Sequence, residues 1–144
     1  MNMPRDILED ITEKKEKVFV IDFPDLHEAQ QTVKDDKARW KILCAGRRFG
    51  KSRLGVQLCI EQALAGGRVW WVAPTFSIAR VGWRDVVAAA SVFPKESGVD
   101  VKVGDMTVTF PGGGSISVKS ADNPQRLRGE GLNFLVMDEA AFVR

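Results

Sequence analysis

Ala45-Gly46-Arg47-Arg48-Phe49-Gly50-Lys51-Ser52 is the stretch that decides the fold of this 144-residue chain. It fits the pattern Gly/Ala-x-x-x-x-Gly-Lys-Ser/Thr, which is typical of a phosphate-binding loop between a strand and a helix. The mainly apolar residues 40–45 before it predict a buried strand, and residues 51–65 after it predict a helix. Glycines let the backbone curl so that successive N–H groups point at phosphate oxygens. The octet therefore predicts a site for the phosphates of ATP.

The last residues of the octet have distinct expected roles. Gly50 lies where a side chain would collide with the β-phosphate, and Lys51 places its charge between the β- and γ-phosphates. We expect the Ser52 hydroxyl to ligand Mg²⁺, while the helix adds the positive end of its dipole. Ala45 replaces the more usual first glycine. The whole octet is thus the predicted nucleotide-binding loop.

An acidic pair near the end of the chain completes the predicted site. Asp138 and Glu139 follow the apolar residues 134–137, which predict a buried strand. An isolated Asp-Glu pair is usually a solvated surface feature, but this one ends a strand in a chain that has a phosphate loop. We expect Asp138 to hold Mg²⁺ through water and Glu139 to orient and deprotonate the attacking water. A glutamate here favours hydrolysis over transfer to a small acceptor.

Arginines occupy loop positions where most such loops carry small or neutral residues. One hypothesis is that Arg47 or Arg48 reaches the γ-phosphate as an internal arginine finger, which contributes about 10³-fold or more in rate. The alternatives are phosphate affinity alone, or a contact to a neighbouring subunit or to DNA. A hydrolytic role predicts that Arg47→Ala lowers turnover far more than nucleotide affinity.

Composition places the chain among soluble single-domain proteins. The hydrophobic fraction is 44% and the charged fraction 28%, both ordinary for globular domains. No apolar run is long enough to span a bilayer. Residues 37–60 contain basic but no acidic residues, which suggests a bound polyanion. We interpret Cys44 and Cys59 as reduced core thiols, and His27 alone cannot form a metal site.

Strand and helix signals alternate along the chain and predict an α/β fold with a mainly parallel sheet. Helices are expected at residues 5–17, 26–36, 51–65 and 77–92, and buried strands at 40–45, 68–73 and 133–137. Residues 99–103 and 106–110 predict a β-hairpin, with a further short strand at 116–118. Residues 120–131 read as a loop.

Three blocks of sequence carry a resemblance to a known family. The runs ARWKILCAGRRFGKS, VWWVAPTFSIAR and SADNPQRLRGEGLNFLVMDEAAF closely resemble the ATPase domain of phage terminase large subunits, the motors that pump viral DNA into capsids. The resemblance covers about residues 26–143. It implies a P-loop NTPase fold of the ASCE/RecA-like kind with a β-hairpin insertion. Residues 1–25 would be an N-terminal extension and residues 26–144 a partial ATPase domain.

The resemblance also assigns roles to single residues. It makes residues 45–52 the Walker A phosphate loop, Asp138 the magnesium aspartate of Walker B, and Glu139 the catalytic carboxylate. Gln30 matches the glutamine that reads the adenine edge; the alternative is an ordinary exposed helix glutamine. Arg128 lies in a family stretch just before the last strand, and its role stays open between nucleotide sensing and loop structure.

The family also implies a setting for the intact motor. This is a homo-oligomeric ring on double-stranded DNA, with a terminase small subunit and a portal protein, in the cytoplasm of an infected bacterial host and not in a membrane. Family members continue with further core strands and a nuclease domain after Glu139, so we expect a C-terminally truncated sheet. Two alternatives remain: a helicase-type ATPase, because Val72-Ala73-Pro74-Thr75 resembles a DNA-contacting helicase motif, and a remnant that does not hydrolyse ATP.

Overall fold

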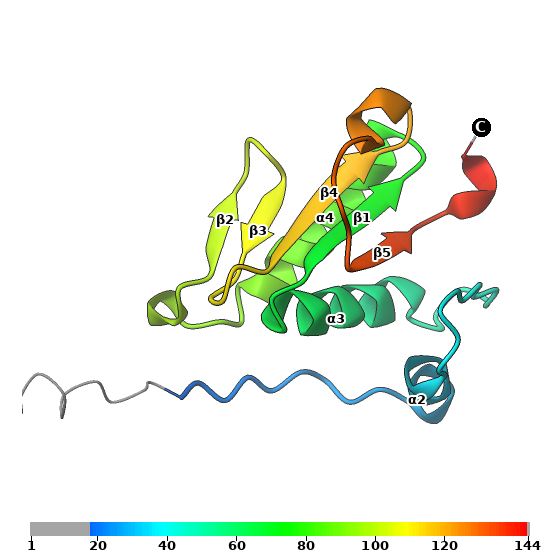
Figure 1. Ribbon diagram of the computed structural model, residues 1–144. Helices are drawn as coiled ribbons and strands as arrows, with labels where there is room; N and C mark the ends of the chain where they lie inside the picture. The colour runs from blue at the N-terminus through cyan, green and yellow to red at the C-terminus, as the bar shows by residue number, and fades with distance from the viewer. Residues whose placement is uncertain (1–17, 144) are drawn as a thin grey trace, which may run out of the picture.

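A five-stranded sheet of order β2-β3-β4-β1-β5 organises the computed structural model (Figure 1), which describes residues 18–143. The strands are β1 (Arg68–Ala73), β2 (Asp100–Lys102), β3 (Thr107–Thr109), β4 (Ser115–Ser120) and β5 (Phe134–Met137). The helices are α2 (Glu28–Asp35), α3 (Lys51–Leu64) and α4 (Phe76–Ala90), with 3₁₀ turns at Lys95–Ser97, Pro124–Leu127 and Ala140–Phe142. The predicted α/β fold is confirmed, whereas the helix expected at residues 5–17 lies outside the described residues.

The sheet is parallel where it meets the predicted site. β1 pairs in parallel with β4 on one side and with β5 on the other, so that Trp70 lies beside Ser117 and Leu135. The predicted hairpin is present: β2 and β3 pair antiparallel, and β3 continues antiparallel onto β4. Because parallel strands end at one edge, β4, β1 and β5 deliver the residues that follow them to a common place.

The core lies between one face of the sheet and the helices α3 and α4. Trp71 is its centre: a Cβ added to Gly55 of α3 or to Gly82 of α4 would approach the Trp71 indole to 2.9 and 2.3 Å respectively. The ring is 1% exposed and is therefore sandwiched between the two helices. Glycines at these positions bring the helices close to the sheet and fix the position of α3, which carries the octet at its start.

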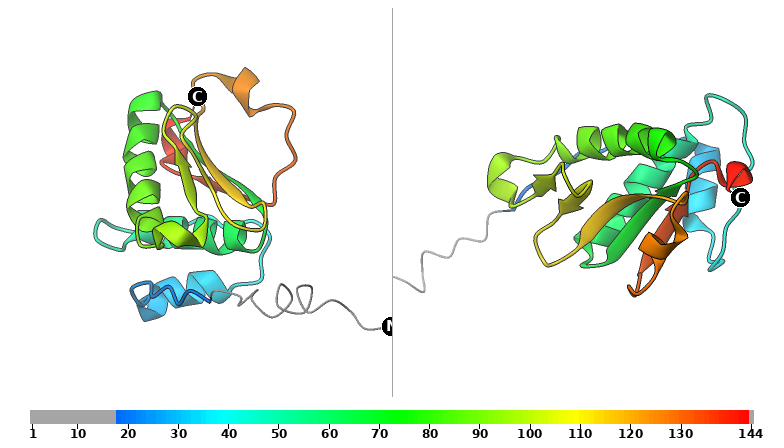
Figure 2. Two further views of the ribbon diagram at one scale, coloured as in Figure 1. Left: turned by 90° about the vertical axis from the view of Figure 1, so that its left-hand side faces the viewer. Right: turned by 90° about the horizontal axis from the view of Figure 1, so that it is seen from above.

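The opposite face of the sheet has no α-helix among the described residues. Figure 2 shows α4 on one side of the sheet and the segment after β4 bulging on the other. On this face Trp70 is buried beneath Lys119, whose Nζ lies 4.5 Å from the ring centroid. Leu135 and Met137 are about two-fifths exposed, at 40% and 44%. No helix among residues 18–143 is long and apolar enough to cross a membrane.

The predicted strand at residues 40–45 is absent, which is a correction to the sequence analysis. The segment is irregular, with Trp40 77% and Ile42 94% exposed. Cys44 is exposed as well, so it is not the expected core thiol, whereas Cys59 is buried. The physical reason is that apolar residues form a buried strand only beside a partner strand, and no described strand pairs with this segment.

The strand β5 was expected to be buried and is instead an edge strand of the described sheet. Within residues 18–143 it pairs only with β1, and its residues alternate between half-buried and exposed. Phe134 and Val136 pack on the core, while Leu135 and Met137 face outward. A four-residue apolar run cannot by itself distinguish a central strand from an edge strand.

Candidate nucleotide site

The predicted loop and the acidic pair lie on the same side of the molecule. Figures 1 and 2 place the start of α3, the helix α2 and the end of β5 together at one end. The fold therefore brings the end of the octet and the residues that follow β5 to one side of the molecule.

The loop has the backbone of an anion-binding turn. Arg48 and Gly50 are in the left-handed region, with φ of 69° and 82°, and the Gly50 carbonyl accepts the first hydrogen bond of α3 from Leu54 N–H at 3.0 Å. Within the described residues the N–H groups of Gly50, Lys51 and Ser52 donate to no protein atom. Free N–H groups at a helix start are the donors that bind phosphate oxygens.

Lys51 is folded back over its own loop. Its Nζ donates to the Ala45 carbonyl at 2.5 Å. A lysine with three donors can keep this bond while it also meets an anion. The structure thus places the predicted phosphate-contacting ammonium at the loop, as the octet pattern requires.

Gln30 is brought against the loop by α2 and is 2% exposed. Its Nε2 donates to the carbonyls of Phe49 at 3.0 Å and Gly50 at 3.1 Å, while its Oε1 accepts from the His27 N–H at 3.1 Å. It is therefore not an ordinary exposed helix glutamine. Its expected contact with adenine stays a prediction, and that contact requires the amide to leave or share these bonds.

His27 is a site residue that sequence reasoning missed. Its Nε2 lies 2.9 Å from the Phe49 carbonyl, and its ring meets Phe49 edge-on with centroids 4.9 Å apart. The available signal was the spacing of a capping box, in which the residue before a helix pairs with a Glu or Gln three positions later. His27 and Gln30 form such a box, but histidine is not among the usual capping residues.

Asp138 and Glu139 leave β5 in different environments. Asp138 extends the pairing of β5 by donating its N–H to the Val72 carbonyl at 2.8 Å. Burial, and secondly the Glu139 charge, raise the pKa of Asp138 above its usual value. Glu139 is exposed and has a positive φ of 49°, a conformation that non-glycine residues rarely adopt outside special sites.

The residues expected to hold Mg²⁺ fit such an ion. The Ser52 hydroxyl is half-buried at the start of α3 and makes no hydrogen bond within residues 18–143, and the Asp138 carboxylate makes no ion pair there. The described residues contain no cluster of three or more His, Cys, Asp or Glu side chains suited to a metal. One carboxylate, one hydroxyl, water and substrate phosphates are the usual Mg²⁺ environment.

No contact among the described residues joins Arg47, Arg48 and Arg128 into one site. Arg47 and Arg48 are exposed on the loop, and within the described residues their guanidinium groups make no hydrogen bond or ion pair. Arg128 is exposed after the 3₁₀ turn Pro124–Leu127, where its N–H donates to the Gln125 carbonyl at 3.4 Å. These contacts do not test the predicted role of Arg128.

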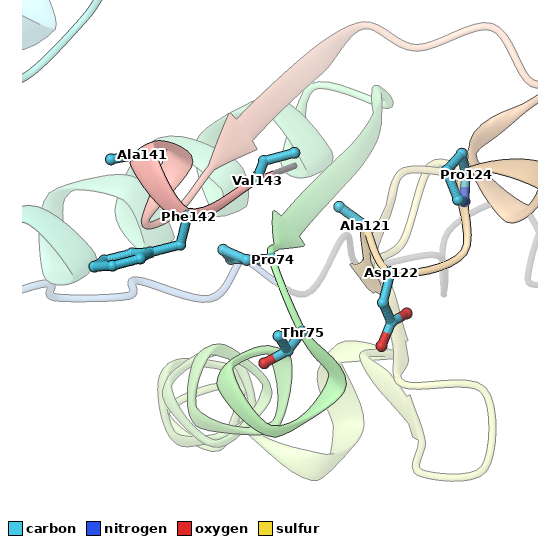
Figure 3. A pocket seen from close by; sticks show the side chains of 8 residues that line it. All are labelled: Pro74, Thr75, Ala121, Asp122, Pro124, Ala141, Phe142 and Val143. Atoms are coloured by element: carbon cyan, nitrogen blue, oxygen red, sulfur yellow. The ribbon is translucent and has the colours of Figure 1, made fainter.

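A cavity of about 640 Å³ opens where the parallel strands end (Figure 3). It is lined by residues that follow each of these strands: Pro74, Thr75, Ala121, Asp122, Pro124, Ala141, Phe142 and Val143. The Thr75 hydroxyl caps α4 by accepting from the Ile78 N–H. The cavity adjoins the acidic pair, because the turn Ala140–Phe142 follows Glu139 directly.

Comparison with known proteins agrees with the sequence resemblance. The chain is 30% identical over 136 residues to the terminase large subunit of Thermus virus P23-45 and 29% identical to that of Thermus phage G20c. The matches cover 81% of this chain and 28% of each relative, so the chain spans little more than a quarter of their length. No family model matches the chain.

Solved structures of similar fold also come from phage terminases. The large terminase ATPase domain of Thermus phage P74-26 aligns with a TM-score of 0.68 and 28% identity, covering 82% of this chain and 55% of that one. A mutant of that domain aligns with a TM-score of 0.66. The chain is thus similar in sequence and in fold to the ATPase domain of phage terminase large subunits, as its motifs predict.

Proposed function

We propose that this chain is the ATP-binding and ATP-hydrolysing part of a viral DNA-packaging motor. The observation that carries the proposal is that the start of α3, where the octet ends, and the end of β5, which Asp138 and Glu139 follow, lie at the same end of the molecule (Figures 1 and 2). A phosphate loop beside an acidic strand end is the arrangement of enzymes that cleave nucleoside triphosphates. The similarity to a large terminase ATPase domain supports the same activity.

The described residues divide the work by position. Free N–H groups at the start of α3 and the Lys51 ammonium would bind the phosphates, with residues 45–52 wrapped around them. Ser52 and Asp138 would hold Mg²⁺, which when bound neutralises charge on the phosphate oxygens. Glu139, exposed beside Asp138, would orient water and accept its proton. Arg47 or Arg48 would contact the γ-phosphate.

The motor setting is part of the proposal. Residues 26–144 would form the ATPase part, preceded by an extension at residues 1–25. Coupling to translocation of double-stranded DNA, a ring of subunits, a portal protein and a terminase small subunit are proposed by similarity to terminase large subunits. The site of action would be the cytoplasm of an infected bacterial host.

A second candidate is nucleotide binding without turnover. It is favoured by the irregular, exposed segment 40–45 before the loop, with which no strand among residues 18–143 pairs. Binding depends on α3 and α2, both of which are in place. Hydrolysis also requires Glu139 to hold the attacking water in line with the γ-phosphate, and this needs a loop and a β5 end that keep fixed positions relative to each other.

Phosphate release tests the proposal and separates the two candidates. We expect Mg²⁺-dependent release by the wild-type chain, which Glu139→Gln slows by about 100-fold or more while ATP binding is kept. The matched control is Glu130→Gln, an exposed glutamate in the segment before β5, which should release phosphate at the wild-type rate. Equal rates for wild type and Glu139→Gln contradict the catalytic assignment. ATP binding with no release selects the second candidate, and a rate raised by DNA supports the motor role.

A further inference from the structure

His27 makes contacts at both nitrogens of its ring. The Nε2 atom lies 2.9 Å from the Phe49 carbonyl, and the Nδ1 atom lies 3.3 Å from the Gln30 N–H. A carbonyl oxygen only accepts, so Nε2 carries the proton and Nδ1 accepts from Gln30. One neutral imidazole therefore caps α2 through Nδ1 and holds the phosphate loop through Nε2.

The loop carbonyls that α2 holds determine where the neighbouring N–H groups point. Every peptide bond among the described residues is trans, so a carbonyl and the following N–H point in opposite directions across one plane. His27 and Gln30 draw the Phe49 carbonyl toward α2, which turns the Gly50 N–H away from α2. The bond from Gln30 to the Gly50 carbonyl does the same for the Lys51 N–H.

The helix α2 and the residues before it are held against α3, which fixes the position of His27 and Gln30 relative to the loop. Lys34 pairs with Glu61 of α3 at 2.6 Å, and Arg53 of α3 donates to the Asp25 carbonyl at 2.8 Å. The approach is close: a Cβ on Gly50 would lie 2.6 Å from the Gln30 Nε2. The loop thus lies between α3 and the His27–Gln30 pair.

We propose that His27 is a positioning residue for phosphate binding, acting through the Phe49 carbonyl to aim the Gly50 N–H group at the phosphates. This inference rests on the proposed nucleotide site. It differs from base recognition, because it predicts that His27 matters equally for ligands with and without adenine.

Two conservative variants separate the two bonds of the ring. An asparagine at this position presents an acceptor near Nδ1 and remains a good N-cap, but it lacks the reach of Nε2. A glutamine carries a donor at the reach of Nε2 but is a poor N-cap. A merely structural role predicts that His27→Asn resembles wild type and that His27→Gln is the weaker binder. Positioning predicts the reverse order for binding.

The experiment measures affinity and stability on the full chain. Binding of a fluorescent ATP analogue with Mg²⁺ gives Kd, and competition with inorganic pyrophosphate gives the affinity for a phosphate-only ligand. We expect His27→Asn to weaken both ligands about fivefold, the effect of one net hydrogen bond, and His27→Gln to restore most of the loss. Thermal unfolding should rank the variants oppositely, with His27→Asn the more stable. Gln31→Ala, exposed on the same helix, is the control and should bind as wild type.

Each outcome bears on the inference. Binding that follows thermal stability, or His27→Asn with wild-type affinity, overturns the positioning role and leaves the nucleotide site intact. A loss for the ATP analogue without a loss for pyrophosphate also overturns it, in favour of a contact to the base. A wild-type chain that binds neither ligand overturns the proposed function itself.

Discussion

Asp138 is the residue at which binding and stability oppose each other. Burial and the adjacent Glu139 raise its pKa, while Lys51 lowers it only in part. The ordinary value for the unfolded chain is 3.8, so the folded chain holds the proton more tightly than the unfolded chain. Ionisation of the carboxyl, which Mg²⁺ binding requires, therefore lowers the stability of the metal-free fold relative to the unfolded chain.

The pH dependence of unfolding checks this. Since the folded state binds more protons, the free energy of unfolding should fall as pH rises from about 3.8 through the raised folded pKa. Asp138→Asn removes this contribution, so the variant should gain stability over wild type at pH 7 and lose that advantage near pH 3. Urea unfolding of both chains without Mg²⁺ at several pH values measures this difference in the free energy of unfolding. A wild-type advantage that grows with pH would contradict the raised pKa.

Gly50 is the loop residue that tolerates a side chain least. Its φ is +82° and an added Cβ would meet Gln30. Gly50→Ala should lower the free energy of unfolding by about 2 kcal/mol, from backbone strain and the displaced Gln30 bonds. Gly46→Ala, with nothing within 4 Å, should change it by less than about 0.5 kcal/mol. Chemical denaturation compares the two, and equal effects would contradict the close contact of α2 with the loop.

At the scale of elements, the packing of α3 and α4 on β1 rests on glycines facing Trp71. Gly82→Ala would normally stabilise a helix by about 1 kcal/mol. Here the new Cβ would lie 2.3 Å from the Trp71 indole, which cannot move away because Gly55 of α3 also packs on it. Such overpacking costs roughly 1–3 kcal/mol. We therefore predict net destabilisation. Gly104→Ala, in an open turn, is the control. A higher melting temperature for Gly82→Ala would contradict the sandwich.

The elements also show which parts of a fold a sequence can predict. The helices α2, α3 and α4, the strand β1 and the hairpin of β2 and β3 were predicted because each carries its signal locally: apolar spacing, a cap or a turn. The strand at residues 40–45 was wrong although its residues are apolar, since strand formation depends on a partner elsewhere in the chain. The position of β5 at the sheet edge was missed for the same reason.

The site divides in the same way. The octet, Asp138 and Glu139 could be predicted as site residues because phosphate and metal chemistry favours their residue types in this order. His27 could not, because its role depends on α2 lying against Phe49, which is a tertiary contact. The burial of Gln30 was also invisible, since its neighbours on α2 are mostly exposed.

At the scale of the whole molecule, the open edge is the most consequential feature. Among residues 18–143, β5 pairs only with β1, and its own Leu135 and Met137 are partly exposed. Unpaired edge strands with apolar side chains associate with other strands. We predict concentration-dependent self-association, which Leu135→Lys should reduce because an edge lysine opposes pairing. Sedimentation velocity over a range of concentrations measures it, with Val103→Lys, exposed elsewhere, as control. A strictly monomeric wild type would contradict this prediction.

The central claim is that residues 45–52 bind the phosphates of ATP with Mg²⁺. Isothermal titration of the wild-type chain against Lys51→Ala, with and without Mg²⁺, tests it most directly. We predict that the wild type binds Mg²⁺-ATP and that Lys51→Ala weakens binding at least about tenfold, the effect of one charge-assisted contact. Equal affinities for the two chains, or no binding by the wild type, would contradict the account.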